Sequence, residues 1–122
     1  MLLSSLSKTY IFDLDGTILV HNGYRNGEEE LLPGVRQFFQ KYITKEDCVI
    51  LITARKSKYR EETIGFLHKN NIPFDHIIFD LPHGERILFN DKKNSGLETS
   101  YSINLVRNEG LRSVEMEISE DL

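Results

Sequence analysis

Short apolar runs alternate with longer, more polar stretches along this chain. Each run has the length and the β-branched or aromatic content of a strand. The five runs lie at residues 9–15, 48–53, 76–79, 86–91 and 113–118. The first four are almost continuously apolar, which is typical of strands that are buried on both faces of a sheet.

Three of the intervening segments have the signals of helices. Pro33 and Gly34 open the first, Ser57 can cap the second, and Gly110 ends the third. The predicted helices lie at about residues 33–42, 57–70 and 97–108. Strands that alternate with helices favour a parallel sheet with helices on both faces. We therefore expect an α/β fold: a three-layer Rossmann-like sandwich with a mostly parallel five-stranded sheet.

The composition is typical of one globular domain. The chain has 122 residues, enough for a single core, so we expect one domain over residues 1–122. A net charge of −4 with scattered Lys and Arg argues against a nucleic-acid partner. No stretch approaches the ~20 apolar residues of a membrane span. The lone Cys48 cannot form an internal disulfide. A cytoplasmic protein without a membrane partner is expected, and the sequence makes no prediction of the oligomeric state.

Polar residues of a particular kind follow three of the predicted strands. Asp13 and Asp15 end the first, Thr53 and Arg55 follow the second, and Asp91 ends the fourth. Ligands of open α/β sheets bind beyond the carboxyl ends of the strands, so the three clusters are expected to converge. Taken alone, the aspartate pair could be a metal site, an acid/base couple or the start of a turn.

The second and third clusters favour chemistry over a plain turn. A third carboxylate beside the aspartate pair describes an oxygen-rich Mg²⁺ site. A metal ion next to a small hydroxyl residue and a glycine turn with exposed amides matches the requirements of phosphoryl transfer. One aspartate can then attack phosphorus, since carboxylates form aspartyl phosphates, while the other moves the proton. The segment 21–32 is a long polar loop and is expected to be a flap over this site.

Three of these segments resemble a known family. YIFDLDGTILV, LITARK and ILFNDKK look like motifs I, II and IV of the haloacid dehalogenase superfamily of phosphohydrolases, over about residues 9–95. More narrowly, LLPGVRQFF, LITARKSKYREETIGFL and FDLPHGERILFNDKKNSG resemble a small group of capsule and polysaccharide biosynthesis phosphatases. The resemblance implies a Mg²⁺-dependent phosphatase without a large cap domain, acting on a small phosphorylated metabolite such as a sugar or polyol phosphate.

The same resemblance implies roles for individual residues. Asp13 would be the nucleophile, and Asp15 the general acid that protonates the leaving alcohol and then activates water. Thr53 would hydrogen-bond the transferring phosphoryl group. The metal would be held by Asp13, by the backbone carbonyl of Asp15 and by Asp91. Further substrate contacts are expected from the turn after Asp13, the flap and the second strand end: Gly16, Thr17, His21, Arg55 and Lys56.

One departure from the family concerns its third motif, a Lys or Arg that neutralises the nucleophile and the phosphoryl group. The corresponding stretch FDLPHGER contains no lysine. Arg86 is the leading substitute by its position, although a guanidinium fork and a lysine point charge are not equivalent. The other candidates are His83, Lys56, Lys58, Lys92 and Lys93.

Two other functions stay open on the sequence alone. A receiver-like module also gathers acids and Mg²⁺ at strand ends and accepts phosphate without rapid release. The acid pair after the first strand argues against it, because Asp15 supplies a hydrolytic base that a slow receiver lacks. A catalytically weak binding protein is the other alternative, suggested by the missing lysine.

Overall fold

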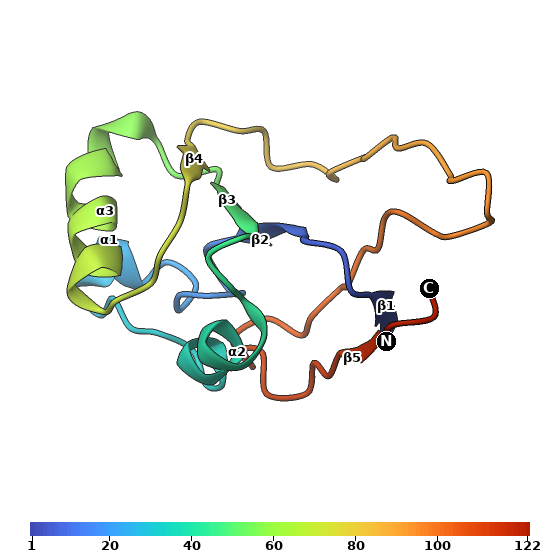
Figure 1. The fold of residues 1–122 in the computed structure, drawn as a ribbon. Coiled ribbons are helices and arrows are strands. Elements are labelled where there is room, and N and C mark those ends of the chain that lie inside the picture. Colours follow the sequence, from blue (N-terminus) through green and yellow to red (C-terminus); the bar gives the residue numbers. More distant parts are fainter.

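The computed structural model describes residues 1–122 and shows a small α/β fold with two separate parallel sheets (Figure 1). Its strands are β1 (Leu2–Ser4), β2 (Thr9–Asp13), β3 (Cys48–Ile52), β4 (His76–Ile78) and β5 (Glu117–Ser119). Its helices are α1 (Gly23–Asn26), α2 (Val35–Tyr42), the 3-10 turn η1 (Ser57–Tyr59) and α3 (Arg60–Lys69).

The larger sheet has three parallel strands in the order β2-β3-β4. Thr9 pairs with Cys48 and Asp13 with Ile52 along the first ladder, so β2 and β3 end together. On the second ladder, Ile52 pairs with Ile78. The first three predicted strands and the first two predicted helices are therefore confirmed, and the carboxyl ends of all three strands meet at one edge.

One face of this sheet carries the core. Phe12 on β2 packs against Phe38 and Phe39 of α2, with ring centroids 6.0 and 5.1 Å apart. Leu51 on β3 and Leu67 on α3 belong to the same buried cluster. On the opposite face, the side chains of Ile11 and Ile78 are 49% and 48% exposed. Helices thus cover one face well and the other poorly, so the expected three-layer sandwich is not what the structure shows.

The expected five-stranded sheet is also wrong, in two places. The last apolar run does form a strand, but β5 pairs with β1 at the N-terminus, Leu2 opposite Glu117, in a separate two-stranded sheet. The expected strand at residues 86–91 is not formed. Its Ile87, Leu88 and Phe89 are 76%, 62% and 89% exposed. A strand is stabilised mainly by its neighbours, and no strand pairs with this segment.

The expected helix at residues 97–108 is not formed either; Leu105 packs against the core, but most of the other apolar residues of the segment stay exposed. Tyr101, Ile103 and Val106 are 50%, 48% and 64% exposed, and a helix without tertiary packing is marginal in water. Residues 82–104, called the arm below, loop away from the body (Figure 1). A single hydrogen bond, from Arg86 to Asp13, joins the arm to the rest of the chain.

No helix of this fold is both long and apolar enough to cross a lipid bilayer.

Candidate active site at the end of strand β2

The turn after β2 is held by its own backbone. The Leu14 carbonyl accepts hydrogen bonds from the N–H groups of Thr17, Ile18 and Leu19 at 3.1, 2.9 and 3.0 Å. Gly16 has a φ of +85° and donates its N–H to the Leu19 carbonyl at 2.7 Å. The amides of Gly16 and Thr17, which were expected to face substrate, are therefore used within the turn, where they fix the direction of the preceding aspartates.

Asp13 is the last residue of β2 and is half-buried. Its Oδ1 lies 3.4 Å from Nη1 of Arg86, and the two side chains are 34% and 40% exposed. Burial raises the pKa of the Asp13 carboxyl above its ordinary value; the charge of Arg86 lowers it, and the charge of Asp15 raises it again. Arg86, the sequence's leading substitute for the missing lysine, is thus the cation that meets Asp13 in this structure.

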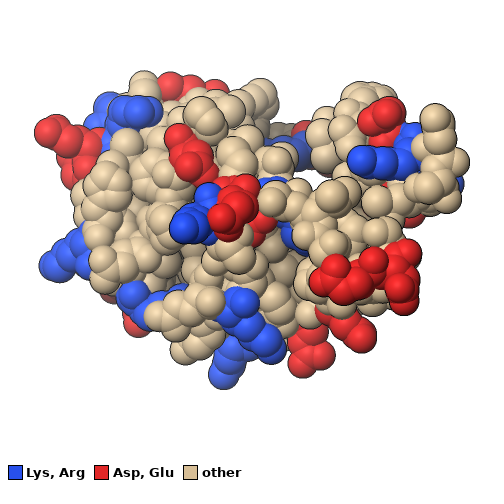
Figure 2. All heavy atoms as spheres, viewed as in Figure 1, with Lys and Arg blue, Asp and Glu red and all other residues tan.

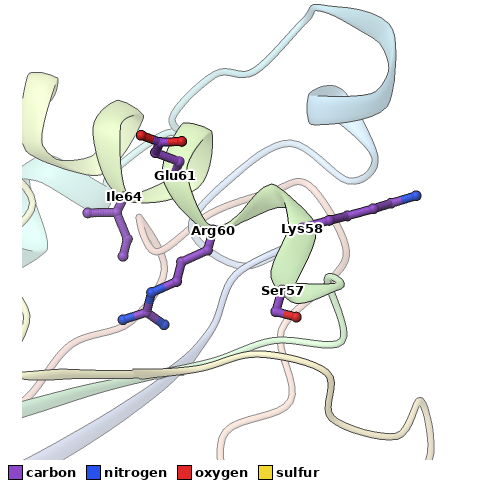
Figure 3. A pocket seen from close by; sticks show the side chains of 5 residues that line it. All are labelled: Ser57, Lys58, Arg60, Glu61 and Ile64. Carbon is purple, nitrogen blue, oxygen red and sulfur yellow. The ribbon is translucent and has the colours of Figure 1, made fainter.

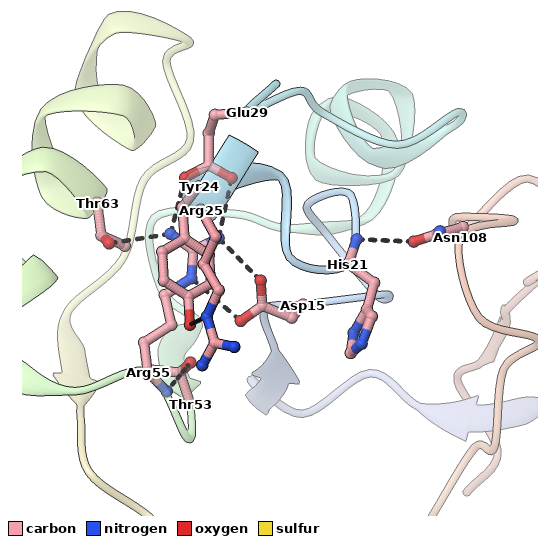
Figure 4. Close-up of polar contacts among 9 residues, drawn as sticks. All are labelled: Asp15, His21, Tyr24, Arg25, Glu29, Thr53, Arg55, Thr63 and Asn108. Atoms are coloured by element: carbon pink, nitrogen blue, oxygen red, sulfur yellow. Dashed lines mark hydrogen bonds and ion pairs between the residues drawn. The ribbon is translucent and has the colours of Figure 1, made fainter. Parts of the chain in front are cut away.

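Asp15 is held by a buried guanidinium. Arg55 donates from Nε to Oδ2 and from Nη2 to Oδ1 of Asp15, both at 3.0 Å (Figure 4). The same guanidinium donates from Nη1 and Nη2 to the Glu29 carboxylate at 2.7 and 2.9 Å. Bidentate pairs between a guanidinium and a carboxylate are strong and fix the geometry of both groups. Asp15 consequently has a defined orientation before any ligand arrives.

Arg55 itself is enclosed on every side. Its Nη1 also donates to Thr63 Oγ1 at 3.0 Å, and its Cζ lies 4.1 Å from the ring centroid of Tyr24. Burial works to lower the pKa of Arg55, but the hydrogen bonds and charges of Glu29 and Asp15 outweigh it and raise the pKa. All five N–H donors of a guanidinium are engaged by these contacts.

The other predicted substrate contacts lie apart from this cluster or inside the fold. Thr53 is fully buried, and its Oγ1 accepts the backbone N–H of Arg55 at 3.0 Å. Lys56 is exposed and helps to lower the pKa of Asp80. His21 donates its backbone N–H to Asn108 Oδ1 at 2.8 Å, while its ring Nδ1 is buried without a hydrogen-bond partner.

The third predicted metal ligand is not near the other two. Asp91 lies in the exposed arm, where its carbonyl accepts a hydrogen bond from the Thr99 hydroxyl, and no three acidic, histidine or cysteine side chains come together as a metal site. The expected convergence of the three clusters is therefore wrong for this one, because residues 86–91 form no strand alongside β2. Asp13 and the Asp15 carbonyl remain as donors, and these two alone do not complete a Mg²⁺ site.

One pocket of the fold is lined by residues other than these carboxylates. It measures about 450 Å³ and is lined by five residues from η1 and the start of α3: Ser57, Lys58, Arg60, Glu61 and Ile64. Lys58 and Arg60 extend in opposite directions from it (Figure 3). Of the residues predicted to take part in catalysis, only Lys58, one candidate for the missing lysine, lines this pocket. Charged side chains do not form one continuous basic surface on the face drawn in Figure 2, where acidic side chains gather near β5.

Sequence reasoning missed three residues of the site. Glu29 is one of three consecutive glutamates in the loop, so nothing singled it out. Thr63 lies within the predicted helix at residues 57–70, and nothing in the sequence marked it as a contact of the site. Asn108 joins the distant C-terminal segment to the turn, because its N–H donates to the Gly16 carbonyl at 2.9 Å. Glu29 is distinguished from its neighbours only by its contact with Arg55, and that contact exists only in the folded chain.

Comparisons with known proteins give two partial likenesses. No protein-family model matches the sequence. A formamidopyrimidine-DNA glycosylase from Rickettsia conorii is 40% identical over 48 residues, which are 39% of this chain and 18% of the glycosylase. A chain in the structure of the Pnkp1/Rnl/Hen1 RNA repair complex aligns with a TM-score of 0.53 and 31% identity, over 67% of this chain and 28% of that one. This chain thus spans about a fifth and about a quarter of the two proteins.

Proposed function

We propose that this protein is a phosphomonoester hydrolase that works through an aspartyl phosphate on Asp13. The observation that carries the proposal is the pair of aspartates at the end of β2, each with its own arginine: Asp13 with Arg86 at 3.4 Å, and Asp15 with Arg55 at 3.0 Å. A plain turn needs neither cation. Two differently held carboxylates suit a nucleophile and a proton carrier.

The proposed reaction has two steps. In the first, an Asp13 carboxylate oxygen bonds to phosphorus as the ester P–O bond breaks, and the leaving oxygen takes a proton from the Asp15 carboxyl. In the second, the Asp15 carboxylate takes a proton from water as the water oxygen bonds to phosphorus. The Asp13–phosphorus bond then breaks, and its electrons return to the Asp13 carboxylate. Each Asp15 oxygen accepts one N–H from Arg55 and keeps a lone pair for this proton.

Arg86 supports the phosphoryl group in this proposal. Its side chain is 40% exposed, so it can turn from Asp13 toward an incoming phosphate while remaining beside the nucleophile. No step is assigned to a metal ion, because Asp13 and the Asp15 carbonyl do not make a complete site. Dependence on Mg²⁺ remains a prediction from the family resemblance.

The proposed substrate class is a small sugar or polyol phosphate used in capsule or polysaccharide assembly, which rests on the narrower sequence resemblance alone. A cytoplasmic location is part of the proposal, and the single free Cys48 agrees with it. A second candidate is a phosphate at the end of an RNA strand. The likeness to a chain of an RNA repair complex, at 31% identity and a TM-score of 0.53, favours this second candidate.

Phosphate release from a substrate panel tests the proposal. The panel contains sugar phosphates, polyol phosphates and an RNA oligonucleotide with a terminal phosphate, each with Mg²⁺ and with a chelator. We expect Mg²⁺-dependent release that falls by at least about a thousandfold in Asp13→Asn, since loss of a nucleophile removes the covalent route. Asp121→Asn, at the exposed C-terminus, is the matched control.

Each other outcome has a distinct meaning. Undiminished release by Asp13→Asn would refute the aspartyl-phosphate mechanism. Release from the RNA end alone would support the second candidate. Stable phosphorylation without release would identify a receiver-like module. No release and no phosphorylation would favour a binding protein.

A further inference from the structure

Glu29 and Tyr24 hold the Arg55 guanidinium together with Asp15. Both belong to residues 21–32, the segment expected to be a flap, whereas Asp15 belongs to the turn after β2 (Figure 4). Glu29 binds two guanidinium nitrogens, and the Tyr24 ring lies against the guanidinium carbon at 4.1 Å. Tyr24 in turn packs edge-on against Tyr59, with centroids 4.8 Å apart. The flap therefore fixes both the plane and the position of the guanidinium.

This arrangement makes Arg55 unsuited to binding substrate. The Arg55 side chain has no exposed surface, and every N–H group on its guanidinium already donates to Asp15, Glu29 or Thr63. A phosphate could reach the guanidinium only by displacing a carboxylate. The structural role that remains for Arg55 is to orient Asp15, which is 18% exposed and so can still meet a ligand.

We propose that Glu29 and Tyr24 are positioning residues for the proton-transfer step, acting through Arg55 on the Asp15 carboxyl. This inference rests on the proposed function. Without Glu29, two of the guanidinium's nitrogens lose a bidentate partner and the fork can rotate away from Asp15. Proton transfer depends strongly on the position of the acid, because donor and acceptor must lie within hydrogen-bond reach. The nucleophile Asp13 makes no contact with Glu29 or Tyr24, so its attack should be unaffected.

The choice of leaving group distinguishes proton transfer by Asp15 from nucleophilic attack by Asp13. p-Nitrophenyl phosphate has a leaving group that departs without a proton, whereas an alkyl phosphate such as a polyol phosphate needs the acid. The ratio kcat/KM reports the reaction up to departure of the leaving group. Loss of Asp15 positioning should therefore lower kcat/KM for the alkyl ester and spare the aryl ester. A purely structural defect would lower both to the same extent.

The experiment compares Glu29→Gln with Glu30→Gln, a matched change at the exposed neighbouring glutamate of the same loop. We expect Glu29→Gln to lower kcat/KM for the alkyl phosphate about ten- to a hundredfold, a part of the full range of general acid catalysis. Its kcat/KM for p-nitrophenyl phosphate should change less than about threefold on the same reasoning. Glu30→Gln should match the native chain on both substrates.

Tyr24 provides a second pair of variants in case Glu29→Gln folds poorly. Tyr24→Leu removes the ring from the guanidinium and should give the same selective loss. Tyr24→Phe keeps the ring and should retain native selectivity, since the Tyr24 hydroxyl contacts only the exposed Arg25. Equal losses on both substrates, or no loss on either, would overturn the positioning role alone. Absence of turnover by the native chain would overturn the proposed function, and this inference with it.

Discussion

Residues 48–52 and residues 86–91 are similar apolar runs, but the first forms a buried strand and the second stays irregular and exposed. The first is β3, the central strand of the larger sheet, and its Val49 and Leu51 are 3% and 0% exposed. The second lies in the arm, and its Phe89 is 89% exposed. β3 has a strand on each side and a helical layer below it. The arm has an open space between itself and the body (Figure 2). An apolar run therefore becomes a strand here only where neighbouring strands pair with it.

The charged residues of the two regions differ in the same way. Arg55, at the end of β3, is 2% exposed and makes two bidentate ion pairs. Arg86, in the arm, makes one contact at 3.4 Å with a side chain that is 40% exposed. Water screens the second pair and competes for its hydrogen bond, so it contributes little to stability. The contacts of Arg55 are therefore rigid, whereas the Arg86 side chain is free to respond to a ligand.

Removal of each arginine is the strongest way to test this contrast. Arg55→Ala leaves Asp15 and Glu29 facing each other without a cation, and we expect it to destabilise the fold by about 3–5 kcal/mol. Arg86→Ala should cost less than about 1 kcal/mol, as for exposed pairs. Urea unfolding followed by circular dichroism measures both. Similar losses in the two variants would mean that the arm is as firmly held as the sheet.

Truncation of one leucine in each region gives the next largest effect. Leu51→Ala opens a cavity beside Phe12 in the core and is expected to cost about 2–5 kcal/mol. Leu88 is 62% exposed in the arm, so Leu88→Ala should lower the free energy of unfolding by less than about 0.5 kcal/mol. The difference between the two urea midpoints is the measurement. A large loss for Leu88→Ala would show that the arm packs against the body in solution.

The smallest expected effect concerns Asp80, at the junction between the sheet and the arm. The backbone N–H of Ser57 donates to its carboxylate at 2.9 Å and lowers the pKa of Asp80 below its ordinary value of 3.8. The folded state therefore favours the ionised form, and the added stability is present above the ordinary pKa and lost as the pH falls through the lower folded-state value.

Asp80→Asn keeps a residue type that tolerates the φ of +64° at this position but removes the charge. We expect a slightly lower melting temperature than native at about pH 7, and a difference that narrows as the pH falls below the ordinary pKa of an aspartate, because the native carboxyl then takes up a proton. Melting curves at about pH 7 and at about pH 3 decide this. A difference in melting temperature that is as large at low pH as at about pH 7 would assign the effect to the hydrogen bond rather than to the charge.

The sequence by itself determined the strands and helices whose partners lie near them in the chain. The apolar runs at 9–15, 48–53 and 76–79 and the helices between them follow from period and capping, because each element packs on the next. The turn after Asp13 was also readable, since aspartate and glycine at a strand end specify it locally. These features placed both aspartates at the edge where ligands of α/β sheets bind.

Only the tertiary structure decided the rest, since it depends on contacts between distant residues. The final apolar run pairs with the N-terminal residues 2–4, and residues 86–91 and 97–108 stay irregular because most of their apolar side chains find no cover in the fold. The partnership of Arg55 with Asp15 and Glu29 spans 40 and 26 positions of the chain. Local propensity cannot encode such a pairing; burial of the guanidinium creates it, because a buried charge must meet opposite charges.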